Sequence, residues 1–181
     1  MPHVQLLSTN LTPDRQELID DIRGAFGGVP NMFQAVANSP AALRFMWAGF
    51  GALGAGQIDQ KLGEQIAVAI ANYNSCEYCL AAHTALGRKA GASAAEMKAA
   101  QIGESADPRT EAALRFVLQV VHNRAHVKEE DFRELRSAGF DDEATTELLA
   151  HVALNLFTNY VNVALAIPVD FPAVPLRTDS R

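Results

Sequence analysis

Apolar residues recur every three or four positions through most of the chain, which is the spacing of amphipathic helices. No stretch alternates apolar and polar residues over the length of a strand, so the pattern predicts an all-α fold. No internal repeat, low-complexity segment or linker divides the chain, and we predict one domain. The expected helices start near Pro13, Asn31, Pro40, Asp59, Cys76, Ala94, Pro108, Glu129 and Asp141 or Asp142.

Capping residues and prolines set the expected limits of this domain. Three helix starts carry an N-cap residue followed by proline at the first helical position, and they are Thr12-Pro13, Ser39-Pro40 and Asp107-Pro108. The last long helix should end at about Ile167, because three prolines make the following segment extended. We therefore expect an N-terminal extension (1–12), a helical domain (13–167) and an extended C-terminal tail (168–181).

Both cysteines lie close together, at Cys76 and Cys79, and His83 follows four residues later. On a helix these three side chains fall within roughly 60° of one another. Two thiols one turn apart can close a disulfide, and the first turn of a helix lowers the pKa of a thiol through its free amide groups and its dipole. His83 is placed to exchange a proton with the Cys79 sulfur, directly or through a water molecule.

A polar break, residues 72–75, separates the cysteines from an apolar helix that contains Glu64. We predict Asn74 as the N-cap of a helix from Cys76 to about Lys89. On one straight helix Glu64 would lie about 18 Å from Cys76. It can join the cysteines only if the chain turns at the break and the two helices pack side by side.

Composition narrows the possible partners and the compartment. Hydrophobic residues make up 49% of the chain, which is enough for a buried core. The net charge is −6 and no basic cluster is present, which argues against nucleic-acid binding. The segment Met1–Leu7 lacks the features of a secretory signal. The most membrane-like stretch, Phe45–Gly56, has twelve uncharged residues, fewer than the ~20 that a membrane span needs. We expect a soluble cytoplasmic protein, where a close cysteine pair is more often catalytic or metal-binding than structural.

The pattern Glu64-x11-Cys76-x2-Cys79-x3-His83, with its internal apolar run, resembles the signature of AhpD-like alkylhydroperoxidases in the carboxymuconolactone decarboxylase superfamily. The resemblance extends over roughly residues 13–172 and is closest to the peroxidase-related branch. The segments that carry it are Val29–Phe33, Ser39-Pro40, Asn159–Asn162 and Asp170–Pro172. It implies an AhpD-like multi-helix bundle and a homo-oligomer, for which the Gly/Ala-rich segment Gly49–Gly56 offers a close-packing surface.

The same resemblance implies that Cys79 is the peroxidatic thiol, Cys76 the resolving thiol, and Glu64 and His83 the proton relay. Cys79 would attack an organic hydroperoxide or hydrogen peroxide, and its sulfenic acid would condense with Cys76. An external dithiol would reduce the disulfide. No flavin, haem or nucleotide motif is visible, so the cycle is expected to need no bound cofactor. Where AhpD has a second histidine before its second cysteine, this chain has Tyr78, as the peroxidase-related branch often does.

Other interpretations of the motif stay open. Cys76, Cys79, His83 and Glu64 are ligand types that zinc accepts, but three of them would crowd one helix face, and we predict no metal. Carboxymuconolactone decarboxylase chemistry does not rest on a cysteine pair. A non-enzymatic redox-sensing oligomer would use the same disulfide as a switch.

The remaining polar side chains are assigned structural roles. We expect His122 and His126 at the surface or at a helix end, and His151 as a hydrogen-bonded structural residue on the last helix. Tyr78 is a candidate pocket wall. Three asparagines on the last helix could bond across a helix or subunit interface, and they are Asn155, Asn159 and Asn162.

Overall fold

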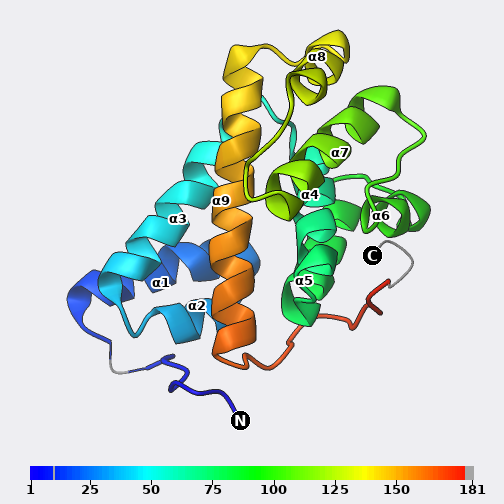
Figure 1. The fold of residues 1–181 in the computed structure, drawn as a ribbon. Coiled ribbons are helices and arrows are strands. Elements are labelled where there is room, and N and C mark those ends of the chain that lie inside the picture. The colour runs from blue at the N-terminus through cyan, green and yellow to red at the C-terminus, as the bar shows by residue number, and fades with distance from the viewer. Residues whose placement is uncertain (10, 178–181) are drawn as a thin grey trace.

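The computed structural model describes residues 1–9 and 11–177, and over this part of the chain it is built from helices joined by short loops (Figure 1). The predicted all-α, single-domain fold is confirmed. The helices are α1 (Pro13–Phe26), α2 (Asn31–Val36), α3 (Pro40–Gly54), α4 (Gln60–Tyr73), α5 (Glu77–Lys89), α6 (Ala94–Ala100), α7 (Pro108–His122), α8 (Glu129–Ser137) and α9 (Asp142–Ala164).

The helix starts follow the capping pattern of the sequence. Side-chain oxygens of Ser39, Asp59, Asp107 and Asp141 each accept a hydrogen bond from the backbone N–H three residues later, at 2.8–3.2 Å. Such bonds satisfy amide groups that have no partner within the helix. Thr12 precedes α1 but makes no side-chain cap bond.

The last helix is shorter than predicted. α9 ends at Ala164 rather than near Ile167, because Ala166 takes a left-handed conformation with φ of 51°. The Ile167 N–H turns back to the Asn162 carbonyl at 3.0 Å. The residue before a proline is disfavoured in the helical region, so the chain leaves the helix before it reaches Pro168.

Helix α4 lies at the centre of the fold, packed against α5, α6, α7 and α9. Every residue from 65 to 72 is buried, so this helix is covered on all sides. Helix α9 runs between α1–α3 on one side and α4–α7 on the other (Figure 1). The two central helices therefore connect both halves of the core.

The turn between α4 and α5 differs from the prediction. Asn74 ends α4, with its N–H bonded to the Ile70 carbonyl at 2.9 Å, and does not cap α5. Its φ and ψ of −82° and 0° are not extended, as an N-cap requires. Cys76 has the extended backbone and is the N-cap, and its sulfur accepts a hydrogen bond from the Cys79 N–H at 3.3 Å. The three-residue turn, with Ser75 at φ of 56°, folds α5 back along α4.

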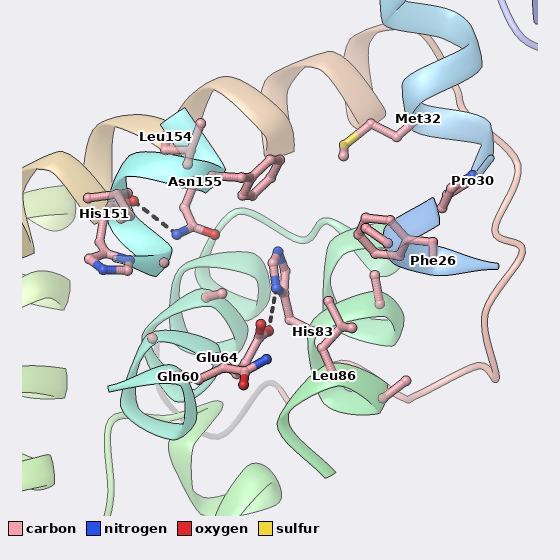
Figure 2. A pocket seen from close by; sticks show the side chains of 18 of the residues that line it. Phe26, Pro30, Met32, Gln60, Glu64, His83, Leu86, His151, Leu154 and Asn155 are labelled. Carbon is pink, nitrogen blue, oxygen red and sulfur yellow. Dashed lines mark hydrogen bonds and ion pairs between the residues drawn. The ribbon is translucent and has the colours of Figure 1, made fainter. Parts of the chain in front are cut away.

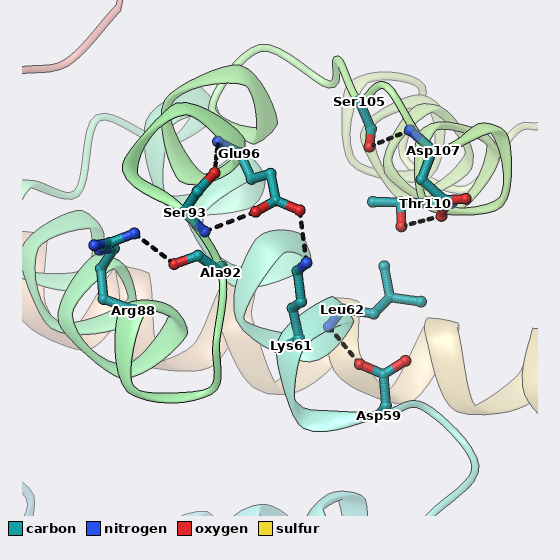
Figure 3. A network of polar contacts seen from close by, with 10 residues as sticks. All are labelled: Asp59, Lys61, Leu62, Arg88, Ala92, Ser93, Glu96, Ser105, Asp107 and Thr110. Carbon is teal, nitrogen blue, oxygen red and sulfur yellow. Dashed lines mark hydrogen bonds and ion pairs between the residues drawn. The ribbon is translucent and has the colours of Figure 1, made fainter.

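Polar contacts hold α6 against the start of α4 (Figure 3). Lys61 on α4 forms an ion pair with Glu96 on α6 at 2.6 Å. Glu96 also accepts from the Ser93 N–H at 2.7 Å, while Ser93 accepts from the Glu96 N–H at 3.1 Å. This reciprocal capping box fixes the start of α6 beside α4.

The segment after α9 is extended and lies against the helices. The Asp170 carboxylate accepts from the Asn31 N–H at 2.7 Å. The side chain of Asn72 exchanges two hydrogen bonds with the backbone of Arg177, at 2.8 and 3.0 Å. These contacts bring residues 168–177 next to α2, α4 and α5. Within the described residues, none of the helices combines the length and apolar character that crossing a membrane requires.

Candidate active site

The two cysteines form a disulfide at the start of α5. Cys76 is the N-cap, Cys79 lies in the first turn, and their Cα atoms are 5.4 Å apart. Their residues are 1% and 2% exposed, so water is almost excluded from both sulfurs. The helix start supplies free backbone amides, one of which already donates to the Cys76 sulfur.

Glu64 and His83 meet across the α4–α5 pair. The Nδ1 atom of His83 lies 2.7 Å from Glu64 Oε2, and both side chains are about 15% exposed. The structure thus provides the turn that Glu64 needs to join the motif. Gly87 permits this approach, because a Cβ there would lie 3.3 Å from the Glu64 Cβ and would overlap Met97. With Nδ1 bonded to the carboxylate, the Nε2 atom is left for a second partner.

A cavity of about 820 Å³ opens beside this pair (Figure 2). Glu64 and His83 lie near His151 and Asn155 of α9, while Phe26 and Pro30 are at the other end in Figure 2. Most of its wall is apolar, which is typical of sites for small molecules. The aromatic side chains that line it are Phe26, Phe33, Trp47, Phe50, Tyr78 and Phe171.

The cysteines do not line this cavity. Cys76 borders a separate hollow of about 210 Å³, and Cys79 lines neither space. In the part of the chain that the structure describes, no hydrogen bond joins His83 to either sulfur. The structure brings Glu64 to His83 and Cys76 to Cys79, but it does not bring the two pairs into direct contact in the disulfide state.

Tyr78 separates the two spaces and lines both of them. Its hydroxyl oxygen accepts from the Met32 N–H at 3.2 Å, and its ring meets Phe171 edge-on with centroids 5.8 Å apart. Burial, and secondarily the neighbouring Asp170 carboxylate, raise the pKa of Tyr78 above its usual value. Tyr78 is therefore a neutral wall, in agreement with the prediction.

A family model matches the segment that contains the cysteine motif, and solved structures match the fold of nearly the whole chain. The model of the carboxymuconolactone decarboxylase family matches residues 40–123, from α3 to the end of α7. A structure described as an alkylhydroperoxidase AhpD core, a peroxidase-related protein from Ralstonia eutropha JMP134, is 27% identical with a TM-score of 0.85. The alignment covers 93% of this chain and 92% of that one. The family match and the likeness to this AhpD core support the AhpD-like carboxymuconolactone decarboxylase superfamily.

Two further solved structures extend the comparison. A peroxidase-related protein from Silicibacter sp. TM1040 is 26% identical over 92% of this chain and 91% of its own, with a TM-score of 0.82. The debrominase Bmp8 in its apo form shares the fold at 22% identity and a TM-score of 0.75, over 87% of each chain. No curated protein matches the chain. The likenesses to the Ralstonia and Silicibacter proteins support the peroxidase-related branch of the superfamily, while the debrominase shows the fold alone.

His151 lines the large cavity, although the sequence predicted a purely structural role for it. It was expected to be hydrogen-bonded, yet its Nε2 is buried without a hydrogen-bond partner among the described residues. The nearest carboxylate oxygen, on Glu147, is 3.9 Å away. Burial lowers the pKa of His151, and the charges of Glu147 and Glu64 only partly oppose this. His151 and Asn155 are one turn apart on α9 and so share a helix face, and this spacing was the sequence signal that both could line one cavity.

Asn162 is the second residue whose role the sequence did not assign. Its side-chain nitrogen donates to the Cys79 sulfur at 3.3 Å and lies 3.2 Å from the Met32 sulfur. It belongs to the Asn159–Asn162 segment of the family resemblance, but no spacing rule connects this segment to a cysteine 83 positions earlier. Within residues 1–9 and 11–177, no cluster of three or more His, Cys, Asp or Glu residues could hold a metal ion.

Proposed function

We propose that the chain is a thiol-dependent hydroperoxide reductase that uses Cys79 and Cys76 as its redox pair. The observation that carries the proposal is the buried disulfide at the start of α5, one helical turn from a hydrogen-bonded Glu64–His83 pair. A thiol at a helix start favours the reactive thiolate, and a carboxylate–histidine pair can move the protons that the reaction needs. The AhpD-like fold supports the same assignment.

In the reduced enzyme, the Cys79 thiolate attacks the terminal oxygen of a hydroperoxide. A sulfur–oxygen bond forms, the oxygen–oxygen bond breaks, and the leaving alkoxide takes a proton from the Glu64–His83 pair. The Cys76 thiol then displaces hydroxide from the sulfenic acid, with release of water, and closes the disulfide. An external dithiol restores both thiols by exchange and becomes a disulfide itself.

The large cavity supports a substrate with an apolar organic group. Its aromatic wall would hold that group, while the polar end with Glu64 and His83 would receive the leaving oxygen. Three neighbours of Cys79 line the cavity, and they are Met32, Tyr78 and Ala82. Reduction frees Cys79 from Cys76, so that its side chain can rotate towards this space. We expect an organic hydroperoxide to react faster than hydrogen peroxide.

The proposal includes a homo-oligomer in the reducing cytoplasm. Helix α9 carries an exposed apolar stripe along its length, in which Tyr160 and Val163 are 61% and 53% exposed. Phe45 of α3, which is 59% exposed, extends this surface. Its ring packs edge-on against that of Phe157, with the ring centroids 5.2 Å apart. Exposed apolar side chains grouped in this way are typical of a protein interface. A second copy of the chain is the partner that the family resemblance implies.

Mass spectrometry of the thiols tests the assignment. One equivalent of an organic hydroperoxide should convert the reduced wild type to the Cys76–Cys79 disulfide, with the loss of two hydrogens. Cys76→Ser should instead trap a sulfenic acid on Cys79, and Cys79→Ser should not react in this way. Thiols that stay reduced in the wild type would contradict the proposal. A sustained peroxide-dependent rate with an external dithiol separates a peroxidase, which turns over, from a sensor, which is oxidised once.

A further inference from the structure

We propose that Asn162 is a positioning residue that stabilises Cys79 as a thiolate. The catalytic importance of this contact rests on the proposed function, in which Cys79 is the attacking thiol. Its own content is a hydrogen bond from the Asn162 carboxamide to sulfur, which a thiol titration measures without any peroxide.

Three helices converge on this contact. The Asn162 side chain on α9 places its nitrogen 3.3 Å from the Cys79 sulfur on α5 and 3.2 Å from the Met32 sulfur on α2. A carboxamide nitrogen carries two hydrogens, so it can donate one to each sulfur. Because Met32 occupies the second donor position, the amide is held with its nitrogen towards Cys79.

The surroundings make this donor necessary for a charged sulfur. Asn162, Cys79 and Met32 are 3%, 2% and 8% exposed, so water cannot solvate the thiolate. Burial by itself raises the pKa of a thiol, because it disfavours the charged form. A hydrogen bond to the charged form acts in the opposite direction and is stronger than one to a neutral group.

In the disulfide state, the backbone hydrogen bond at the helix start goes to the other cysteine and not to the Cys79 sulfur. The Cys79 N–H donates to the Cys76 sulfur at 3.3 Å, so the backbone supports the first cysteine. The hydrogen bond to the Cys79 sulfur comes from Asn162. The two thiols thus have different stabilising donors, one from the backbone of α5 and one from a side chain of α9.

The ionisable groups nearby are engaged elsewhere. On the elements that pack around Cys79 they are Tyr78 and His83 of α5, Glu64 of α4 and Asp170 of the C-terminal segment. Glu77 of α5 also borders the smaller hollow, but its residue is exposed to water. His83 is bonded to Glu64, while Tyr78 and Asp170 contact the backbone at Met32 and Asn31. The Asn162 oxygen is buried without a hydrogen-bond partner among the described residues. The hydrogen bonds that the Asn162 side chain makes are therefore those of its nitrogen, to the two sulfurs.

This arrangement also predicts which sulfur the reductant attacks. Cys76 borders the smaller hollow together with Tyr78 and Asn162, whereas Cys79 does not line it. An external thiolate would bond to the Cys76 sulfur, the disulfide would break, and the electron pair would leave on Cys79, where Asn162 stabilises it. The second thiol of the reductant would then release Cys76.

The decisive experiment titrates Cys79 alone, in the Cys76→Ser background, by thiolate absorbance in the ultraviolet. Asn162→Leu, of similar size but without a donor, should raise the thiol pKa. At pH values below the pKa, the thiolate fraction should then fall about tenfold. Asn162→Asp should raise the pKa further, because a carboxylate beside the sulfur repels its charge. Asn159→Leu is the matched control: Asn159 is fully buried on the same helix, its oxygen bonds to Asn74, and the thiol pKa should not change.

A second readout uses the intact cysteine pair. Removal of the donor destabilises the reduced form, in which Cys79 is a thiolate, so Asn162→Leu should make the disulfide harder to reduce in a dithiothreitol redox buffer. Asn162→Asp serves in both assays if Asn162→Leu does not fold. An unchanged thiol pKa and an unchanged redox equilibrium in a folded variant would overturn the inference. A shifted pKa in a chain that never turns over peroxide would instead refute the proposed function and leave the role of Asn162 intact.

Discussion

The carboxylate of Glu64 determines how His83 can act. Because Glu64 accepts at Nδ1, 2.7 Å away, the neutral imidazole keeps its proton there and its Nε2 is free to take one from a reacting group. The carboxylate also stabilises the imidazolium that follows.

Glu64→Gln should therefore reduce kcat/KM for an organic hydroperoxide by about 100-fold, within the usual range for loss of a general acid–base partner. The amide has nearly the same shape, so the far-ultraviolet circular dichroism should not change. Initial rates at saturating reductant provide the measurement. Glu134→Gln, at an exposed ion pair with Arg115, is the control and should keep the full rate. Equal rates in both variants would remove Glu64 from the proton relay.

His151 makes the stability of the fold depend on pH. Its folded-state pKa lies below the ordinary 6.5, so the unfolded chain binds this proton more readily. The stability that it contributes is complete above about pH 6.5 and is lost as the pH falls through the lower folded-state pKa. The urea midpoint of the wild type should therefore drop more between pH 7.5 and pH 5.5 than that of His151→Gln. His126→Gln, at an exposed position, should follow the wild type, and parallel curves for all three would contradict the prediction.

Among the helices, α6 depends most clearly on a capping box. The ion pair with Lys61 and the hydrogen bonds with Ser93 lower the pKa of Glu96 to about 2 from 4.5. Its stabilising contribution is complete above about pH 4.5 and is lost as the pH falls towards 2. The difference in urea midpoint between wild type and Glu96→Gln should be largest near neutral pH and should vanish near pH 2. Glu17→Gln at an exposed site is the control, and a pH-independent difference would show that the charge is not responsible.

The contact between α5 and its neighbours depends on Gly87. A methyl group there would overlap Met97 and press on Glu64, so Gly87→Ala should lower the free energy of unfolding by about 1–3 kcal/mol. It should also slow turnover, because Glu64 would move relative to His83. Gly24→Ala in α1, where a Cβ meets nothing within 4 Å, should instead stabilise the fold by about 0.5–1 kcal/mol. Urea denaturation of both variants checks the pair, and a stabilising Gly87→Ala would refute the close contact.

Local signals predicted the helices well, and long-range contacts explain the errors. Caps at Ser39, Asp59 and Asp107 are read from neighbouring residues, so the sequence was sufficient for them. Asn74 was misassigned because its side-chain amide donates to Asn159, a residue far along the chain that the local sequence does not reveal. The Glu64–His83 contact needed only a turn between adjacent helices. The roles of His151 and Asn162 depend on how α9 packs against α4 and α5, which periodicity does not encode.

At the scale of the whole molecule, the apolar stripe of α9 should control self-association. The double variant Tyr160→Lys and Val163→Lys places two charges on this surface and should convert an oligomeric wild type to a monomer. Sedimentation velocity gives the masses. Glu130→Lys on the exposed surface of α8 is the control and should keep the wild-type mass. A wild type that sediments as a monomer would rule out the homo-oligomer, and an oligomeric double variant would place its interface elsewhere.

The α4–α5 pair draws all four proposed catalytic residues from one stretch of twenty, residues 64–83. Contacts between such close neighbours form early, whereas Asn162 arrives only with the last helix. During synthesis the cysteines therefore leave the ribosome well before the donor that is proposed to activate Cys79. The nascent chain would hold Cys79 without its side-chain donor, and only the completed fold would make this thiol fully reactive.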